Sequence, residues 1–432
     1  MKYFGTGGIR GIWGSTLDVE LVTRVAMAIV EFKPKSICLG HDTRESGDEI
    51  QLALYKVFAS RGITVVNIGV VPTTVLAFMT HQFKCDIGIM ITASHNPPDN
   101  NGIKVFDKHG EQFDGADLEK LDTLVGEVVY KVEGEKGERY MTKQQPRLTM
   151  GQTDPTVPWK NYILDKFRGV LGGRALPRVA IDFANGSGAA VGMDILQKLG
   201  FTVVDGFNME TDGKNVNRNC GATHPEFICD KVKKSKGKYE IGFAFDGDAD
   251  RCIVCDERGN LIEPDVLLAA LALNNFDTRH VVGTVMTNTG IEKFLKTLGL
   301  TLHRTPVGER YVVAKIKELE KTGIKNIVGG EASSHYVFPD IIYAGESLVA
   351  LLKTVEMITA RNKPVSEAMK DVAAGMWPSI LKNVPELIPA RETKYDDARV
   401  LIRQSGTEKL TRVFVEAETK QRMDELLKEV LG

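Results

Sequence analysis

A unit of strand, polar loop, helix and strand recurs three times in this chain of 432 residues, and it constrains the fold more than any other feature of the sequence. The copies cover residues 37–68, 179–204 and 281–303. In each copy, an apolar run precedes a glycine-containing polar loop, an amphipathic segment and a second, short apolar run. This alternation predicts parallel βαβ units with right-handed crossovers. We therefore expect three related α/β domains, in which the loops after the first strands share one edge.

Domain boundaries are expected where this pattern lapses. Residues 134–158 are charged and polar, and further breaks fall at 256–264 and 362–364. About 70 residues then remain, too few for a fourth copy of the unit. The prediction is an α/β fold: three related α/β domains with mixed, mostly parallel sheets, plus a smaller C-terminal α+β domain. The expected domains are residues 1–150, 151–256, 257–362 and 363–432.

The balance of charge argues against polyanionic partners. The chain has 55 Lys and Arg residues against 57 Asp and Glu residues, for a formal net charge of -2. We therefore expect neither a nucleic acid nor an anionic membrane surface as a partner. No apolar run reaches the roughly 18 residues of a membrane span, and residues 1–10 lack the apolar segment of a signal peptide. A cytoplasmic protein that acts on a small molecule is the expectation.

The six cysteines predict neither a disulfide framework nor a zinc site. They are scattered along a long chain, as reduced thiols are. Cys252 and Cys255 have the spacing of a zinc or redox pair, but they lie in a strand-like run, where residues three apart point to opposite faces. No second pair completes a tetrahedral site. Both side chains should pack in the core.

Residues 91–104 form a polar, turn-rich segment directly after the apolar run 87–91. Open α/β sheets place ligands in loops at the ends of buried strands. This loop offers the hydroxyl of Ser94, the imidazole of His95 and the ammonium of Lys104. An ordinary turn rich in Asn and Pro has the same composition, but three later polar loops make sense if they face this one.

Three carboxylates, those of Asp246, Asp248 and Asp250, alternate with small residues in a second loop. In an extended loop every second side chain points the same way, so these charges would repel one another without a cation. Mg²⁺ fits because it takes oxygen ligands in near-octahedral geometry. An EF-hand calcium loop needs glycine at its sixth position, where this chain has Arg251. A solvated acidic turn is the remaining alternative.

A third loop, residues 329–335, offers Glu331, Ser333 and His335 after a strand-like run. A carboxylate can accept paired hydrogen bonds, a serine can donate or accept, and a histidine can donate or transfer a proton. These groups suit sugar hydroxyls. Taken alone, the segment also fits a solvated, serine-rich turn.

The fourth loop contains Arg403, Ser405, Gly406 and Thr407, and Arg412 follows shortly after it. Arginine, hydroxyl groups and a backbone relaxed by glycine are what a phosphate dianion needs. The alternative is that Ser405 or Thr407 caps a helix.

Together, the four loops resemble those of the α-D-phosphohexomutase superfamily, in the same order and along nearly the whole chain. The family's phosphoserine, metal, sugar and phosphate loops are similar to residues 92–97, 246–251, 330–335 and 403–407. Within the superfamily, the bacterial phosphoglucosamine mutases are resembled most, at residues 3–6, 220–226, 284–288 and 307–311. The resemblance implies four domains around a central active-site cleft, each of which gives one loop.

The resemblance also implies a reaction. Ser94 would carry a phosphoryl group, with one Mg²⁺ held by Ser94, Asp246, Asp248 and Asp250. Glucosamine 6-phosphate would accept that group at O1, and the resulting 1,6-bisphosphate would turn end for end and return its other phosphate to Ser94. Glucosamine 1-phosphate would remain, to feed UDP-N-acetylglucosamine and cell-wall precursor synthesis. A hexose 1,6-bisphosphate would act as activator, and the protein would be a monomer or a homodimer.

Roles for single residues follow from the same resemblance. Mg²⁺ and Arg251 would offset charge on the transferring phosphoryl group. Lys104 and His95 are the candidates for proton transfer at the sugar hydroxyl. Lys104 could act as a base if Arg10, Arg44 and the metal lower its pKa. The phosphate loop would hold the phosphate that does not react.

Four positions depart from the family pattern: Gly7, His41, Glu309 and Ser334. Ser334 replaces a glycine of the sugar loop, and a residue other than glycine restricts the backbone there. Sugar specificity therefore stays open, because a phosphomannomutase or phosphoglucomutase would use the same serine and metal. A phosphosugar-binding protein without turnover is a third hypothesis.

Overall fold

The computed structural model describes residues 1–5, 7–128, 154–274, 279–404 and 410–431. The chain divides into two compact units. The first comprises Met1–Ile262 and Ser334–Val365, and the second comprises Glu263–Ser333 and Ser366–Gly432. No helix within the described ranges is long and apolar enough to cross a membrane.

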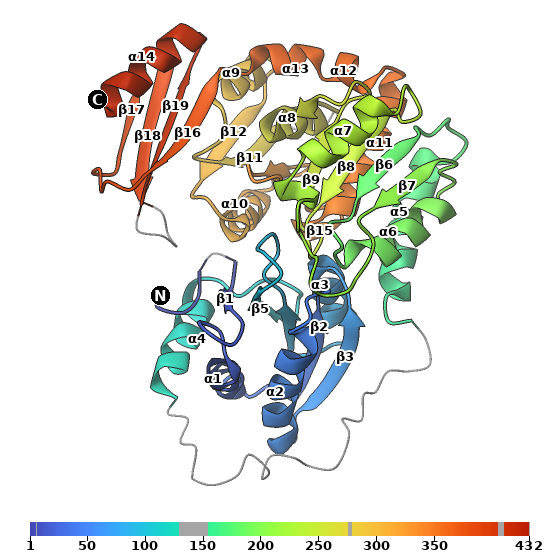
Figure 1. The fold of residues 1–432 in the computed structure, drawn as a ribbon, viewed down its shortest axis with the longest axis vertical. Helices are drawn as coiled ribbons and strands as arrows, with labels where there is room; N and C mark the ends of the chain where they lie inside the picture. Colours follow the sequence, from blue (N-terminus) through green and yellow to red (C-terminus); the bar gives the residue numbers. More distant parts are fainter. Residues whose placement is uncertain (6, 129–153, 275–278, 405–409, 432) are drawn as a thin grey trace. The chain divides into compact units, whose positions relative to one another are not determined.

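A five-stranded sheet with the order β1-β5-β4-β2-β3 begins the first unit (Figure 1). Its elements are β1 (Ile9–Ile12), α1 (Val19–Val30), β2 (Ser36–His41), α2 (Gly47–Ser60), β3 (Thr64–Val70), α3 (Thr73–Gln82), β4 (Ile87–Ile91), β5 (Asn100–Asp107) and α4 (Gly115–Glu127). Strand β2 pairs in parallel with β3 and β4, while β5 runs antiparallel to β4 and β1.

Helices cover both faces of this sheet because its central strands are apolar on both faces. Ile37, Leu39 and Ile89 share one core with helices α1, α2 and α4. On the other face, glycine leaves room for α3, since a Cβ at Gly88 would lie 2.3 Å from the Oγ1 of Thr80. The first predicted repeat is confirmed as the unit β2–α2–β3.

A second five-stranded sheet in the same unit has the order β10-β9-β8-β6-β7. Its elements are α5 (Val157–Leu171), β6 (Val179–Asp182), α6 (Gly188–Lys198), β7 (Val204–Phe207), the 3-10 helix η1 (Gly221–Thr223), α7 (Glu226–Lys234), β8 (Ile241–Phe245), β9 (Cys252–Cys255) and β10 (Leu261–Ile262). Strand β6 is parallel to β7 and β8, and β9 is antiparallel to β8 and β10.

The second repeat is therefore confirmed, with one difference at its end. Strand β7 begins at Val204, where the predicted copy (residues 179–204) was expected to end, because Phe201 is buried ahead of the strand and pairing with β6 starts at Val204. Cys252 and Cys255 lie on β9 with buried side chains, as expected, and both are free thiols.

A hairpin and a long helix complete the first unit. Strands β14 (Tyr336–Phe338) and β15 (Ile342–Gly345) pair antiparallel, and α11 (Ser347–Arg361) follows them. The side chain of Glu346 caps α11 by accepting a hydrogen bond from the Val349 N–H. The Ser347 N–H donates to the carbonyl of Ala249 over 3.2 Å. The start of α11 therefore supports the loop of the three aspartates.

In the second unit, the third repeat forms a parallel set of strands. Its elements are α8 (Pro264–Asn274), β11 (His280–Thr284), α9 (Thr289–Thr297), β12 (Thr301–Thr305), α10 (Glu309–Lys321) and β13 (Val328–Gly330). Strand β11 pairs in parallel with both β12 and β13, which confirms the predicted β11–α9–β12 unit.

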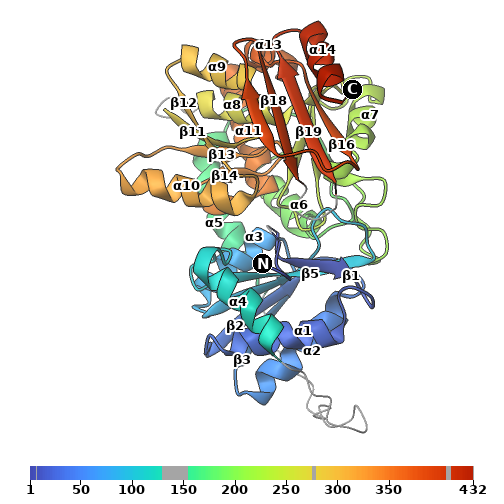
Figure 2. The same cartoon turned by 90° about the vertical axis from the view of Figure 1, so that its left-hand side faces the viewer.

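An antiparallel sheet with the order β16-β19-β18-β17 forms the C-terminal part of the second unit. The elements of this region are α12 (Val365–Ala368), α13 (Lys370–Gly375), β16 (Ser379–Val384), β17 (Arg391–Lys394), β18 (Ala398–Gln404), β19 (Thr411–Ala417) and α14 (Lys420–Leu431). Helix α14 lies against one face of this sheet (Figure 2), where Val400, Ile402, Val415 and Leu426 are buried. The expected smaller α+β domain is confirmed.

Candidate active site

Ser94 lies in the loop after β4 and is buried, with 1% of its surface exposed. Its backbone is left-handed, with φ of 53°, a conformation that costs a residue with a side chain about 1–2 kcal/mol. The Ser94 N–H donates to the Oγ1 of Thr92 over 2.8 Å. The Ser94 hydroxyl donates to the Oδ2 of Asp246 over 2.6 Å. The serine of the first polar loop and an aspartate of the second are thus brought together.

The carbonyl groups of the Ser94 loop are held by two side chains. Arg44 donates through Nη2 to the carbonyls of Ser94 and Asn96, over 2.9 and 2.8 Å. Asn217 donates through Nδ2 to the same two carbonyls, over 2.8 and 3.1 Å. Asp42 in turn accepts from the Nε of Arg44 over 3.0 Å. These donors hold Ser94 in its left-handed conformation.

The three aspartates of the second loop converge between β8 and β9. Asp246, Asp248 and Asp250 are buried, and one ligand oxygen from each lies within 4.8 Å of the others. The Oδ2 of Asp248 accepts from the hydroxyl of Thr73 over 2.6 Å. The Oδ1 of Asp248 is buried without a hydrogen-bond partner among the described residues. A buried set of carboxylate oxygens with one oxygen unsatisfied fits Mg²⁺.

Lys104, on β5, is bound to the same aspartates. Its Nζ donates to Asp248 and Asp250 over 2.8 Å each. Burial alone would lower the pKa of Lys104, but the charges of Asp248 and Asp250 outweigh burial and raise that pKa above its ordinary value. A role for Lys104 as a base required that Arg10, Arg44 and a metal lower this pKa, and the two aspartates act in the opposite direction. Lys104 is a cation in this arrangement, because its nearest charges are negative.

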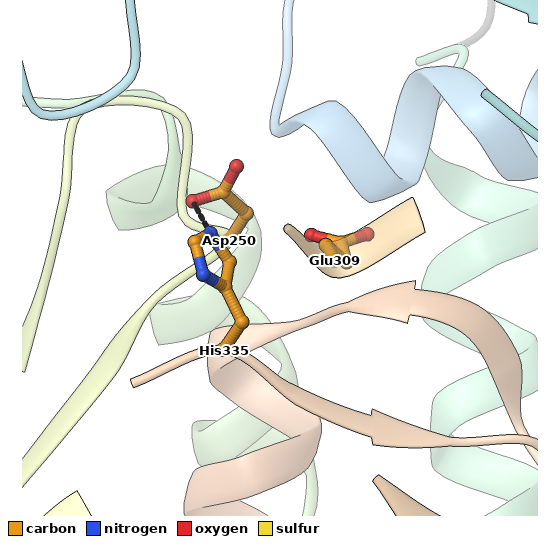
Figure 3. A group of neighbouring side chains, drawn as sticks. All are labelled: Asp250, Glu309 and His335. Carbon is orange, nitrogen blue, oxygen red and sulfur yellow. Dashed lines mark hydrogen bonds and ion pairs between the residues drawn. The ribbon is translucent and has the colours of Figure 1, made fainter. Parts of the chain in front are cut away.

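The carboxylates of the site differ in their affinity for protons. Burial, followed by the charges of Asp250 and Asp248, raises the pKa of Asp246 to about 8. Burial also acts to raise the pKa of Asp250, but Lys104 and His335 outweigh it and hold that pKa well below its ordinary value. The Nε2 of His335 lies 3.1 Å from the Oδ1 of Asp250 (Figure 3). Additional positive charge is needed to ionise all three aspartates together.

Positive charge also gathers beside Ser94. Burial, followed by the charges of Arg251 and Arg10, lowers the pKa of His95 to about 3, so its imidazole is neutral at pH 7. The Nδ1 of His95 lies 3.4 Å from the Ser94 hydroxyl oxygen. The Nε of Arg251 lies 3.8 Å from the Oδ2 of Asp246, and the Nε of Arg10 is buried without a partner among the described residues. Two arginines and a neutral imidazole suit a phosphoryl group on Ser94.

In the second unit, Glu331 of the third polar loop binds the loop that precedes α10. Glu331 is buried, and its Oε1 accepts from the Gly308 N–H over 2.7 Å. The Ser333 hydroxyl donates to the Oε2 of Glu331 over 3.3 Å. Gly308 has φ of 135°, which glycine alone adopts readily. Glu309 is the first residue of α10, where an acidic side chain suits the helix dipole.

Two arginines of the fourth loop region lie opposite each other. Arg403 on β18 pairs in register with Arg412 on β19. Burial, followed by the charge of Arg412, lowers the pKa of Arg403. Two like charges side by side favour an anion between them. Ser405, Gly406 and Thr407, predicted to share this site, lie outside the described residues.

Ser334, which departs from the family pattern, is left-handed, with φ of 69°. Its carbonyl accepts from the Cys252 N–H over 2.9 Å, and its side chain is buried. The backbone therefore keeps the conformation that a glycine would adopt there. His335, the next residue, still reaches Asp250.

Three residues that contact the site were not expected from the sequence: Asp42, Thr73 and Asn217. Asn217 belongs to the segment Lys214–Cys220, which contains three asparagines, and two of these, Asn217 and Asn219, are left-handed. A cluster of asparagines signals unusual backbone conformation. Nothing in that cluster reveals that one amide meets a loop 121 residues earlier in the chain.

Four family models match the chain. The models of phosphoglucomutase/phosphomannomutase alpha/beta/alpha domains I, II and III match residues 1–128, 172–259 and 263–375, and the model of the C-terminal domain matches residues 359–432. The phosphoglucosamine mutase of Nautilia profundicola is 36% identical over 447 residues, which cover 99% of this chain and 97% of that protein.

Solved structures share the fold. A phosphoglucomutase/phosphomannomutase family protein from Burkholderia thailandensis has a TM-score of 0.75 at 23% identity, over 98% of this chain and 95% of that chain. An N-acetylphosphoglucosamine mutase from Aspergillus fumigatus, in complex with GlcNAc-6P and magnesium, has a TM-score of 0.61 at 18% identity, over 100% of this chain and 95% of that chain. The chain belongs to the phosphoglucomutase/phosphomannomutase family of the α-D-phosphohexomutase superfamily.

Proposed function

We propose that the protein is a phosphoglucosamine mutase, which interconverts glucosamine 6-phosphate and glucosamine 1-phosphate through a phosphoserine at Ser94. One observation carries the proposal: the buried Ser94 hydroxyl lies 2.6 Å from Asp246, in a cluster of three aspartates. The name of the relative from Nautilia profundicola, which matches nearly the full length, supports the choice of sugar.

The first step is a phosphoryl transfer from Ser94. The bond between phosphorus and the serine oxygen breaks, a bond to O1 of glucosamine 6-phosphate forms, the proton of that hydroxyl passes to a base, and the freed serine oxygen takes up a proton. His95 and Lys104 are the two candidates for this base: His95 is neutral and its Nδ1 lies 3.4 Å from the Ser94 oxygen, but a pKa of about 3 makes it a weak base, and Lys104 must first lose its proton. Lys104 is a cation, so it is suited to offset negative charge on the phosphoryl group.

Charge stabilisation is the main task of the remaining groups. Asp246, Asp248 and Asp250, with an oxygen on Ser94, would hold one Mg²⁺, which supplies positive charge against the transferring phosphoryl group. Arg251 and Arg10 add positive charge from the protein itself. After the first transfer, the 1,6-bisphosphate must turn end for end and return its other phosphate to Ser94.

The second unit would bind the part of the substrate that does not react. Glu331 and Ser333, with His335 of the first unit, are proposed to contact sugar hydroxyls. Arg403, Ser405, Gly406, Thr407 and Arg412 are proposed to hold the second phosphate. The expected domains 1–150, 151–256, 257–362 and 363–432 would then each supply one loop to a central cleft.

Several properties complete the proposal. A hexose 1,6-bisphosphate would phosphorylate Ser94 and restore enzyme that has lost its phosphoryl group. The partner is a small phosphosugar rather than a nucleic acid or membrane, and the protein is a monomer or a homodimer. Free thiols suit a reducing compartment, so we place it in the cytoplasm.

Phosphorus NMR tests the proposal directly. The protein is supplied with Mg²⁺ and a trace of hexose 1,6-bisphosphate, and then with glucosamine, glucose or mannose 6-phosphate in separate samples. Preferred conversion of glucosamine 6-phosphate is expected, and Ser94→Ala should abolish it. Ser347→Ala is the matched control, because Ser347 is also buried and its hydroxyl has no partner among the described residues.

The other outcomes separate the alternatives. Preference for mannose or glucose 6-phosphate would assign the protein to the phosphomannomutases or phosphoglucomutases. Binding of phosphosugars by phosphorylated protein, without conversion of any of them, would favour a binding protein.

A further inference from the structure

Two histidines meet on neighbouring strands of the second unit, outside the four polar loops of the proposed mechanism. His280 is the first residue of β11, and His303 lies on β12, two positions beyond Thr301, the register partner of His280. Alternate residues of a strand share a face, so both imidazoles lie on the same face of the sheet. Both side chains are half-buried. Neither has a part in the chemistry described above.

The two rings are placed so that a nitrogen of one meets a nitrogen of the other. The Nδ1 of His280 lies 2.9 Å from the Nε2 of His303, and one ring donates a hydrogen bond to the other across this contact. The ring centroids are 5.2 Å apart, with 22° between the ring planes. Two nitrogens that bind one Zn²⁺ at about 2.0–2.1 Å lie roughly 3 Å from each other. The pair already has the spacing of two ligands of a single ion.

The surroundings of His303 favour the neutral imidazole. Burial, followed by the charges of His280 and Lys315, lowers the pKa of His303. Neutral imidazole is the form that binds metals. Lys315 belongs to α10, which packs against β11 and β12 (Figure 2). Its charge opposes a cation at the pair, but Glu318 offsets that charge, with 2.7 Å between its Oε1 and the Nζ of Lys315.

The type of donor atom determines which ion fits. Mg²⁺ prefers oxygen ligands, as the three aspartates near Ser94 offer, whereas imidazole nitrogens suit Zn²⁺, Ni²⁺ and Cu²⁺. The histidine pair is therefore expected to select a different ion from the aspartates. Water would fill the positions around the ion that the two histidines leave open.

We propose that His280 and His303 form a binding site for a divalent transition-metal ion such as Zn²⁺, separate from the three aspartates. The ion takes the place of the hydrogen bond between the rings. Each of the two nitrogens gives a lone pair to the ion, and the proton of the donating ring moves, through water, to the other nitrogen of that ring. No proton is lost overall. The bound ion ties β12, at the edge of its sheet, to β11.

Calorimetric titration with Zn²⁺ tests the site. The protein is stripped with EDTA, freed of the chelator and saturated with Mg²⁺, which competes for the aspartates. Zn²⁺ binding at the pair should weaken about 100-fold in His280→Asn and in His303→Asn, because a single imidazole loses the gain of two linked ligands. His109→Asn is the matched control, because its ring lies beside that of His81 but with 6.3 Å between centroids. It should bind Zn²⁺ as wild type does.

Chemical modification gives a second readout that needs no variant, so it also serves if the asparagine variants do not fold. Diethyl pyrocarbonate modifies neutral imidazoles, and mass spectrometry identifies the modified residues. In wild type, Zn²⁺ should slow the modification of His280 and His303, because the ion occupies their lone pairs. The exposed His109 should be modified at the same rate with and without Zn²⁺.

Two results would overturn the proposal. The first is equal Zn²⁺ affinity in wild type, His280→Asn and His303→Asn. The second is unprotected His280 and His303 at saturating Zn²⁺, because an ion held by thiols or aspartates leaves these imidazoles open. Neither measurement uses a sugar or a phosphate, so the site is tested whether or not the protein proves to be a mutase.

Discussion

The Ser94 site and the Arg403–Arg412 pair handle charge in opposite ways. Around Ser94, three aspartates meet the positive charges of Lys104 and Arg251, which balance them in part. At the C-terminal sheet, two arginines face each other in register and repel. The first site is preorganised by its own charges, which favours catalysis. At the second, the charge of Arg412 lowers the pKa of Arg403, an arrangement that favours an anionic ligand.

Replacement of Lys104 should give the largest effect. Lys104→Met leaves Asp248 and Asp250 without their shared cation, so the free energy of unfolding of metal-free protein should fall by about 3–5 kcal/mol. Added Mg²⁺ should recover part of this loss, because it supplies positive charge to the same carboxylates. Urea unfolding in EDTA and in Mg²⁺ measures both values.

The control for Lys104 is Lys198→Met, which breaks a half-exposed pair with Asp194 and should change stability by about 0.5 kcal/mol or less. An equal loss of stability for Lys104→Met with and without Mg²⁺ would contradict a metal site at these aspartates.

Replacement of Arg403 should separate function from stability. Arg403→Met relieves the repulsion with Arg412, so the free energy of unfolding should change by less than about 1 kcal/mol. Loss of a charged donor to phosphate should lower kcat/KM by about 10- to 100-fold. Arg391→Met, at an exposed position on β17, is the control and should leave kcat/KM unchanged. A large loss of stability in Arg403→Met would contradict the repulsion between Arg403 and Arg412, and with it the difference in charge between the two sites.

Replacement of Asn217 tests whether its hydrogen bonds to the carbonyls of Ser94 and Asn96 hold Ser94 in its left-handed conformation. Asn217→Ala removes the donor shared by the carbonyls of Ser94 and Asn96 and should cost about 1–2 kcal/mol of stability. Phosphorylation of Ser94 by a hexose 1,6-bisphosphate should slow as well, because the left-handed serine loses support. Mass spectrometry follows that phosphorylation. Asn219→Ala is the matched control, being left-handed and exposed. Equal effects of both variants would show that the carbonyl contacts do not matter.

Ser334→Gly should have the smallest effect. Relief of the left-handed backbone is partly offset by the greater freedom of glycine in the unfolded chain, so a gain of about 0.5 kcal/mol is expected. Thermal unfolding measures it. Ser334→Ala keeps the strain and should not stabilise the protein. A loss of stability in Ser334→Gly would mean that the serine side chain contributes a contact of its own.

Local patterns in the sequence predicted the fold well, because each of the three repeats carries its own strand and helix periodicity. That Ser94 and the three aspartates share one site was an expectation from the family resemblance, and the structure places the Ser94 hydroxyl 2.6 Å from Asp246 although the two loops follow strands of different sheets. The last strand of the second copy was predicted too early in the chain, because the buried Phe201 belongs to the apolar run but precedes the residues that pair with β6.

The charge state of Lys104 could not be predicted in the same way. Its partners Asp248 and Asp250 lie 144 and 146 residues further along the chain, so their contact depends on how the first two sheets pack. The contact of Arg399 with the Val285 carbonyl has the same origin, because the two residues lie 114 positions apart in the chain. Sequence motifs show which side chains are available, while tertiary packing determines which opposite charges meet.

The most direct test of Ser94 as the phosphoryl carrier is a single-turnover experiment. Protein labelled with phosphate at Ser94 is mixed with excess glucosamine 6-phosphate and Mg²⁺, and the reaction is quenched at short times. The account predicts that the label leaves the protein and appears in glucosamine 1,6-bisphosphate before glucosamine 1-phosphate accumulates. Formation of glucosamine 1-phosphate while the label stays on Ser94 would contradict it.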